Sequence, residues 1–163
     1  MKGRHAIAKG CAVLAALVCA ACASSSGAAP GPAGAPGPHR QAIFPPGQSP
    51  NGIYSPGIRT GNLIFFSGQI GATEQTRAMT QGRVEAEVQN ALDSLERIMT
   101  AAGVTKADVV KCTVFLADIG DYNAMNGVYR AFFGDSPPAR TAVAVNGLPG
   151  QAVVEIECFA AAR

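Results

Sequence analysis

The chain has 163 residues, which is enough for one domain of ordinary size and too few for two. Four of its 13 basic residues lie in the first 40 positions, whereas all 11 acidic residues lie after them. Residues 41–163 therefore carry 9 bases and 11 acids, a net charge of −2. Because positive charge dominates affinity for nucleic-acid phosphates, we expect no binding to nucleic acid.

Histidine is missing from residues 41–163, since His5 and His39 both precede them. This excludes a Ser-His-Asp or Cys-His triad there, and any metal site that needs imidazole. The phosphate-binding pattern G-x-x-x-x-G-K-[ST] is also missing, so nothing indicates nucleotide hydrolysis.

Residues 1–22 have the three-part layout of a secretory signal: a basic start, an apolar run over residues 11–18 and then small residues. A spanning helix needs about 20 apolar residues, so this run is too short to cross a bilayer. Residues 18–22 also resemble a bacterial lipobox, which makes Cys22 the expected site of lipidation and the membrane anchor. The alternative is ordinary cleavage of the A-x-A pattern at residues 21–23, which would give a soluble periplasmic protein.

Residues 23–40 consist almost entirely of Ala, Gly, Pro and Ser, with no large side chain to bury. We expect a disordered tether between the anchor and a domain over residues 41–163. Ala23 replaces the Asp that favours retention in the inner membrane, so the expected location is the periplasmic side of the outer membrane.

Two helices are predicted after residue 41. Between Arg83 and Ala102, apolar residues recur at steps of three and four, and Gly103 ends the pattern. A shorter helix is predicted from Tyr122 to Phe133, with Asp121 as its N-cap and Gly134 at its end. Each helix has one apolar face, so each must pack on another element.

β-branched and aromatic residues predict strands over 63–70, 109–116, 139–145 and 153–160. The order of elements indicates an α+β sandwich, with both helices on one face of the sheet. Alternation in the last strand directs Val154, Ile156 and Cys158 to one face, and Glu155, Glu157 and Phe159 to the other. Two acids and a Phe outside the core suggest that this face meets another subunit.

Cys112 and Cys158 both lie at apolar positions of their strands, where cysteine is usually a small buried hydrophobic residue. An oxidising compartment would also permit a disulfide between them if the two strands are neighbours, and the spacing leaves both possibilities open.

Arg140 begins a predicted strand after two prolines, and its planar guanidinium suits bidentate binding of a carboxylate. Glu155 lies on the outer face of the last strand, where its carboxylate could orient a water molecule. Tyr54, Ser67 and Asn126 are further polar candidates, although each also fits an ordinary turn or helix surface.

Together these segments resemble the RidA (YjgF) family of enamine/imine deaminases. The resemblance runs from about Ile53 to Ala162 and rests on motifs in a fixed order. They are Tyr54-Ser-Pro-Gly57, Gly61-Asn62, Phe66-Ser-Gly-Gln-Ile70, Asp108-Val-Val-Lys-Cys-Thr-Val-Phe-Leu116, Asn126 with Tyr129 and Phe132-Phe133, Pro138-Ala-Arg140, and Val154-Glu-Ile-Glu157. The resemblance implies a chorismate-mutase-like fold with a mixed β-sheet, and a homotrimer with active sites between subunits.

By the same resemblance, Arg140 matches the arginine that binds the substrate carboxylate and Glu155 the glutamate that positions the attacking water. Tyr54, Ser67 and Asn126 match residues of the substrate pocket. The implied reaction is hydrolysis of a 2-imino acid, or its enamine tautomer, to a 2-keto acid and ammonia. It requires neither a metal nor an organic cofactor. The alternative is a non-catalytic envelope lipoprotein that binds a small carboxylate on the same fold, whereas RNA cleavage is disfavoured by the net charge.

Overall fold

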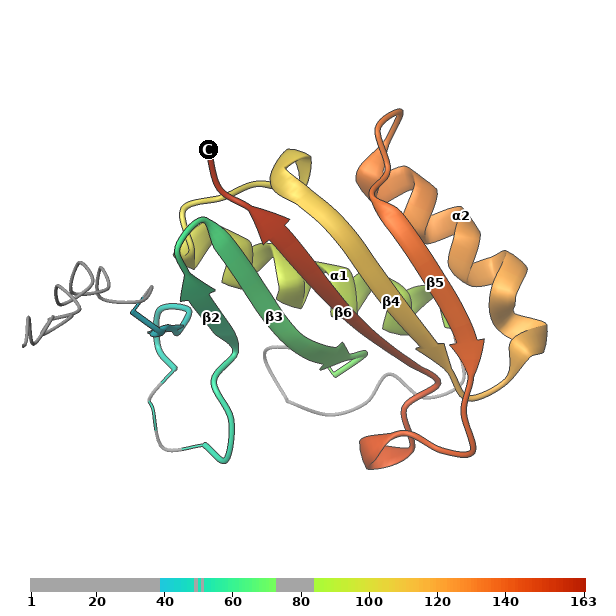
Figure 1. The fold of residues 1–163 in the computed structure, drawn as a ribbon. Coiled ribbons are helices and arrows are strands. Elements are labelled where there is room, and N and C mark those ends of the chain that lie inside the picture. The colour runs from blue at the N-terminus through green and yellow to red at the C-terminus, as the bar shows by residue number, and fades with distance from the viewer. Residues whose placement is uncertain (1–38, 49, 51, 73–83) are drawn as a thin grey trace, which may run out of the picture. The chain divides into compact units, whose positions relative to one another are not determined.

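The computed structural model describes residues 39–48, 50, 52–72 and 84–163. The predicted signal, Cys22 and all but the last two residues of the predicted tether lie outside these residues. The described residues form six strands and two helices (Figure 1). They are β1 Gln41–Ile43, β2 Gly57–Thr60, β3 Leu63–Ile70, α1 Val84–Ala101, β4 Val109–Leu116, α2 Tyr122–Phe133, β5 Ala139–Ala144 and β6 Val154–Ala161.

The six strands form one mixed sheet in the order β1-β2-β3-β6-β4-β5. Strands β4 and β5 are parallel and are joined through α2, whereas every other neighbouring pair is antiparallel. The sheet thus places β6 at its centre and β5 at an edge, next to α2 (Figure 1). This confirms the predicted α+β class with a mixed sheet.

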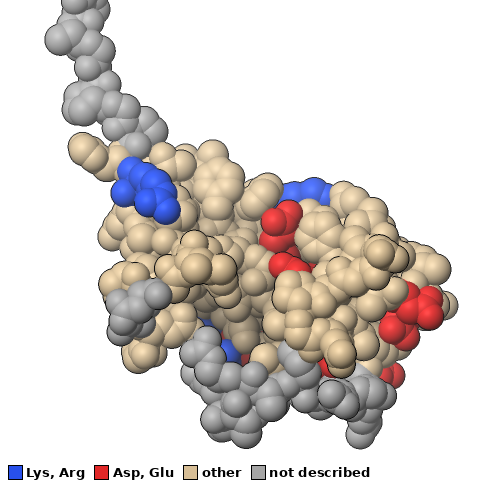
Figure 2. Space-filling view, turned by 90° about the horizontal axis from the view of Figure 1, so that it is seen from below, with Lys and Arg blue, Asp and Glu red and all other residues tan. Residues whose placement is uncertain are grey.

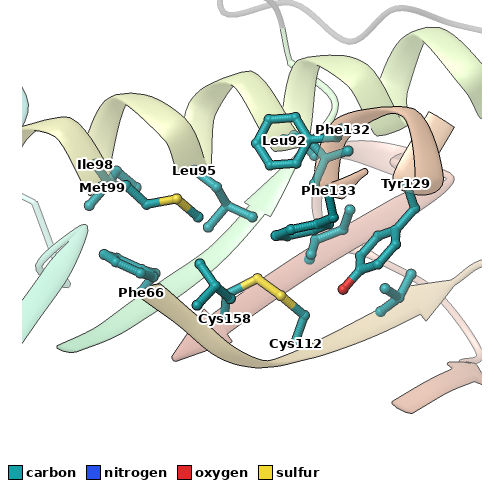
Figure 3. Packing of buried hydrophobic residues seen from close by; sticks show 14 of the residues in the cluster. Phe66, Leu92, Leu95, Ile98, Met99, Cys112, Tyr129, Phe132, Phe133 and Cys158 are labelled. Carbon is teal, nitrogen blue, oxygen red and sulfur yellow. A yellow bond between two sulfur atoms is a disulfide. The ribbon is translucent and has the colours of Figure 1, made fainter. Parts of the chain in front are cut away.

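Both helices pack on one face of the sheet, with α1 across β3 and β6 and α2 beside α1 (Figure 1). The apolar positions of α1 are buried against the sheet, as the three- and four-residue spacing predicts (Figure 3). One polar residue shares that face: Glu87 is 1% exposed and accepts a 2.8 Å hydrogen bond from the backbone N–H of Val153, just before β6. The sequence analysis did not identify Glu87.

The predicted helices agree with the structure to within two residues, and α2 begins and ends where predicted. Gly103 and Gly134 follow the helices with φ of +70° and +66°, values that favour glycine. Asp121 occupies the predicted N-cap position, but its side chain makes no capping hydrogen bond. A 3-10 turn over Ile119–Asp121 leads into α2, and Asp118 caps that turn by accepting a hydrogen bond from the N–H of Gly120.

Cys112 and Cys158 form a disulfide between the neighbouring strands β4 and β6 (Figure 3). The two residues lie directly opposite each other in the antiparallel pair, and both are fully buried on the helix side. Of the two possibilities that the sequence left open, the structure therefore has the disulfide. It closes a loop with a sequence separation of 46 residues.

The face of the sheet opposite the helices carries exposed apolar side chains. Leu63, Phe65 and Val143 are 43, 40 and 39% exposed, and the ring of Phe65 lies 5.1 Å from that of Phe159. Glu155 and Glu157 alternate with the buried residues of β6, as the predicted parity requires. We call this surface the open face. Among the described residues, no helix is long and apolar enough to span a membrane.

Candidate active site

Arg140 is the second residue of β5 and extends toward α2. It is paired in register with Cys112 on β4, whose side chain points to the helix side, so the guanidinium points to that side as well. Its carbon Cζ lies 4.6 Å from the ring centre of Tyr129, while Nη2 donates a 3.3 Å hydrogen bond to the hydroxyl of Tyr122. Nη1 contacts the sulfur of Met125 at 3.6 Å. Three side chains of α2 thus hold the guanidinium in place.

A cavity of about 250 Å³ lies between α2 and the start of β5. It is lined by Asn126, Tyr129, Arg130, Gly134, Pro137, Pro138 and Arg140. Two of the predicted site residues, Arg140 and Asn126, therefore meet in one cavity. Its size suits a small metabolite better than a drug-sized ligand.

The charge of Arg140 has no acidic partner among the described residues, since the ion pair found there joins Arg163 to Asp108. The groups that touch the guanidinium are two phenol side chains and a thioether, all neutral. Burial raises the pKa of Tyr129 to about 12, although the nearby Arg140 opposes that shift. The cavity consequently offers a positive charge that an anion can neutralise.

Glu155 lies on the open face of β6, next to a bulge in β3. Pairing with β6 shifts between Phe66 and Gln69, so Ser67 and Gly68 together oppose one residue of β6. Gly68 lies directly under Glu155, because a Cβ at position 68 would come within 2.8 Å of the carboxyl carbon. Burial, and secondarily the charge of Glu157, raises the pKa of Glu155. A raised pKa makes this carboxylate a better base once it is ionised.

Ser67 is engaged with the preceding loop. Its hydroxyl donates a 2.7 Å hydrogen bond to the carbonyl of Ser55, and its N–H donates to the carbonyl of Pro56 at 2.9 Å. Tyr54, in the same loop, is 62% exposed, and its neighbour Ile53 is fully exposed. The loop is therefore fixed at Ser55–Pro56, while Tyr54 points away from the domain's own core.

The predicted site residues form two groups within one chain. Arg140 and Asn126 belong to the cavity on the helix side, whereas Glu155 lies on the open face beside the Ser67–Gly68 bulge. In the register of the sheet, Arg140 of β5 is aligned with Cys112 of β4 and with Cys158 of β6. Cys158 is three residues away from Glu155 along β6. The structure thus does not bring Arg140 and Glu155 together in a single copy of the chain.

Tyr122, Met125 and Arg130 were not predicted as site residues, and Tyr129 was named only among the family motifs. For Tyr122, Met125 and Tyr129 a signal was present, because residues at i, i+3, i+4 and i+7 of a helix share one face, and residues 122, 125, 126 and 129 have that spacing. Among the described residues, no cluster of three or more His, Cys, Asp or Glu could hold a metal ion.

The fold and the cavity define a small α+β domain with a cationic pocket between α2 and β5. Residues 46–162 match the family model described as Endoribonuclease L-PSP. The chain belongs to this family, which is the RidA (YjgF) family.

Individual relatives agree with this assignment. A RutC family protein of Pyrococcus horikoshii is 40% identical over 111 residues, which cover 68% of this chain and 88% of the relative. A 2-iminobutanoate/2-iminopropanoate deaminase of Dermatophagoides farinae is 38% identical over 120 residues, covering 74% of this chain and 94% of the relative. The crystal structure of E. coli TdcF with bound serine covers 76% of this chain and 99% of its own, with 32% identity and a TM-score of 0.69.

Proposed function

We propose that the chain hydrolyses 2-imino acids, or their enamine tautomers, to 2-keto acids and ammonia, as with 2-iminopropanoate giving pyruvate. The observation that carries this proposal is the guanidinium of Arg140, which lines a small cavity and is held there by neutral groups alone. A relative named as a 2-iminobutanoate/2-iminopropanoate deaminase supports the reaction type. A structure of another relative contains serine, an amino acid with the same carboxylate group.

In the proposed mechanism, Arg140 binds the substrate carboxylate through two parallel hydrogen bonds. Glu155 accepts a hydrogen bond from a water molecule and directs its oxygen at the imine carbon. The water oxygen bonds to that carbon as the π electrons of the C=N bond move to nitrogen, and one water proton passes through Glu155 to the nitrogen, which gives a carbinolamine. The hydroxyl proton of the carbinolamine then passes through Glu155 to the nitrogen, the C–N bond breaks as the C=O bond forms, and ammonia and the 2-keto acid leave. The imine carbon is already electrophilic, so binding and orientation can supply the acceleration without a cofactor.

A second copy of the chain would complete this site. Arg140 and Glu155 point to opposite sides of the sheet in one copy, so one must come from a neighbour if both act on one substrate. The apolar side chains of the open face, Leu63, Phe65 and Val143, are a suitable contact surface for that neighbour. We therefore propose a homotrimer with sites between subunits, to which Tyr54 and Ser67 contribute from the loop beside β3.

A second candidate function is non-catalytic binding of a small carboxylate. The cavity of a single copy already contains Arg140 and Asn126 but does not include Glu155. Such a cavity could hold a carboxylate without directing any water at it.

The name of the family model also raises RNA cleavage. On the face drawn in Figure 2, basic side chains form small separate groups and no continuous patch. The net charge of −2 and the missing histidines in residues 41–163 give no further support. We therefore do not propose this activity.

The sequence of the N-terminal residues supports a proposal for the cellular location of the protein. We propose that residues 1–22 export the protein and that Cys22 carries a lipid that anchors it on the periplasmic side of the outer membrane, with residues 23–40 as the tether. The disulfide in the domain is consistent with an oxidising compartment. Intact mass of the purified protein tests this proposal, because lipidation adds the mass of the acyl groups and Cys22→Ala abolishes that addition.

The decisive experiment generates 2-iminopropanoate in situ with an amino-acid oxidase and follows release of pyruvate. It compares the full chain, Arg140→Ala, Glu155→Gln and no protein. If the full chain accelerates pyruvate release and both variants lose this acceleration, the result supports the deaminase proposal. If the full chain matches the uncatalysed rate but still binds pyruvate through Arg140 in calorimetry, the carboxylate-binding alternative replaces it.

A further inference from the structure

The cavity at Arg140 contains a second guanidinium. Arg130 lies in the last turn of α2 and lines the same cavity of about 250 Å³. It is exposed, and neither its guanidinium nor that of Arg140 meets a carboxylate oxygen within 4.0 Å among the described residues. The lining itself includes two arginines and no acid.

Two different elements supply the two charges. Arg130 follows Asn126 by four residues, so both side chains lie on the face of α2 that borders the cavity. Arg140 reaches the cavity from β5, where Tyr129, Tyr122 and Met125 hold it. One cation is thus fixed, while the other sits on a long exposed side chain that can adjust to a ligand.

Two positive charges at one small cavity repel each other unless an anion lies between them. A ligand with one carboxylate neutralises only the charge of Arg140. A ligand with two carboxylates can satisfy both arginines, and each gains a charge-assisted hydrogen bond. The remaining lining, Gly134, Pro137 and Pro138, is small or rigid and adds no group that would repel a second carboxylate.

We propose that this site prefers 2-imino dicarboxylic acids of four or five carbons, such as iminosuccinate, and that Arg130 binds their second carboxylate. The inference rests on the proposed deaminase function for the reaction itself. The substrate must then be supplied by a two-electron oxidation of the Cα–N bond of an acidic amino acid, or by loss of water from its β-hydroxylated form. The product is the matching 2-keto dicarboxylic acid.

Arg130 has one other explanation, because a cation in the last turn of a helix interacts favourably with the helix dipole. That role concerns stability and does not depend on the substrate. A change in the preference between two substrates therefore separates the two explanations.

The test compares kcat/KM of the full chain for iminosuccinate and for 2-iminopropanoate, each generated in situ by an amino-acid oxidase. The variants are Arg130→Gln, Arg130→Lys and, as a loss of charge outside the cavity lining, Arg163→Gln. We expect wild type to prefer iminosuccinate and Arg130→Gln to lower that preference about tenfold, mainly through KM. Arg130→Lys should restore part of the preference, and Arg163→Gln should leave it as in wild type. If wild type hydrolyses both imines but Arg130→Gln leaves their ratio unchanged, the inference is wrong.

A binding measurement distinguishes failure of this inference from failure of the proposed deaminase function. Calorimetry compares the binding of succinate, which has two carboxylates, with that of propionate, which has one. Neither compound is an imine, so neither can be hydrolysed during the measurement. If neither imine is hydrolysed but succinate still binds more tightly than propionate in an Arg130-dependent way, the deaminase proposal fails and the dicarboxylate site stands. Equal binding of succinate and propionate overturns the site.

Discussion

The ring of Tyr129 lies 4.6 Å from the guanidinium carbon of Arg140, while its own hydroxyl is buried without a hydrogen-bond partner among the described residues. The ring and the hydroxyl of Tyr129 therefore contribute differently to the site and to stability. The aromatic face holds the guanidinium by a cation–π contact. The hydroxyl has lost its contact with water without gaining a bond in return.

Because the ring and the hydroxyl of Tyr129 contribute differently, we expect different results from two substitutions of this residue. Tyr129→Phe keeps the ring and removes the hydroxyl, so it should leave activity within about twofold and stability equal or higher. Tyr129→Leu removes the ring face, and KM for a 2-imino acid should rise about fivefold to thirtyfold, in line with about 1–2 kcal/mol for a partly desolvated cation–π contact. Steady-state kinetics and thermal unfolding of both variants measure this. Equal kinetics for the two variants would show that the ring does not position Arg140.

Gly68→Ala should impair the site through Glu155. A Cβ at position 68 would collide with the carboxyl group of Glu155, so the carboxylate must move. A displacement of about 1 Å in a positioning group can cost about a hundredfold in rate, and we expect kcat to fall tenfold to a hundredfold. Gly127→Ala is the matched control, since a Cβ there meets nothing within 4 Å. An active Gly68→Ala variant would mean that Glu155 has no part in catalysis.

The raised pKa of Glu155 predicts a pH dependence of activity. Because Glu155 acts as the carboxylate, the rate should rise with pH through a pKa above the usual 4.5. Glu157→Gln removes the neighbouring negative charge that contributes to this shift, so the acidic limb of the pH profile should move to lower pH. Glu155→Gln should lower kcat about a hundredfold and abolish that limb. An acidic limb that is the same in wild type and Glu157→Gln would contradict this assignment.

The same shift has a consequence for stability. An acid with a raised pKa holds its proton more tightly in the folded protein than in the unfolded chain. The folded state therefore binds more protons between the ordinary and the raised pKa, and the free energy of unfolding falls as pH rises through that interval. Glu155→Gln should remove this part of the pH dependence. Denaturant titrations at several pH values, with wild type and Glu155→Gln side by side, measure the difference.

Reduction of the disulfide should destabilise the domain strongly. For a closed loop of 46 residues, chain entropy gives a stabilisation of about 4 kcal/mol, and native disulfides typically contribute about 2–4 kcal/mol. Thermal unfolding with and without reductant tests this, and the double variant Cys112→Ala, Cys158→Ala serves as the reference that no longer responds. A wild-type Tm that is unchanged by reductant would contradict the prediction.

Both helices and four of the six strands were predictable because each carries its own apolar pattern, whereas the short strands β1 and β2 were not predicted. The strands predicted over 63–70 and 109–116 have the bounds found. The strand predicted over 139–145 is one residue longer than β5, and the one predicted over 153–160 is displaced from β6 by one residue at both ends. The disulfide was left open because a spacing of 46 residues does not reveal which strands are neighbours. The helix start at residue 122 and its N-cap residue Asp121 were predicted, whereas the 3-10 turn before the helix, which Asp118 caps, was not.

Of the predicted site residues, the structure brings two to the cavity and leaves Tyr54, Ser67 and Glu155 outside its lining. Arg140 and Asn126 were placed in one pocket, and the cavity contains both. The bulge that puts Gly68 beneath Glu155 depends on the pairing of β3 with β6, which a single sequence does not reveal. Arg130 is an ordinary exposed helix residue in the sequence, and only the packing of α2 against β5 brings it to the cavity.

The disulfide also changes how the domain responds to a cut in its backbone. Every residue that lines the cavity, and Glu155 as well, lies between Cys112 and Cys158. A protease that cleaves once after Arg130 would therefore release no fragment, since the two pieces stay covalently joined across β4 and β6. A nicked protein would keep its full apparent mass on a gel until reductant is added, and its cavity walls could remain assembled throughout. The cross-link thus protects the continuity of the site as well as the stability of the fold.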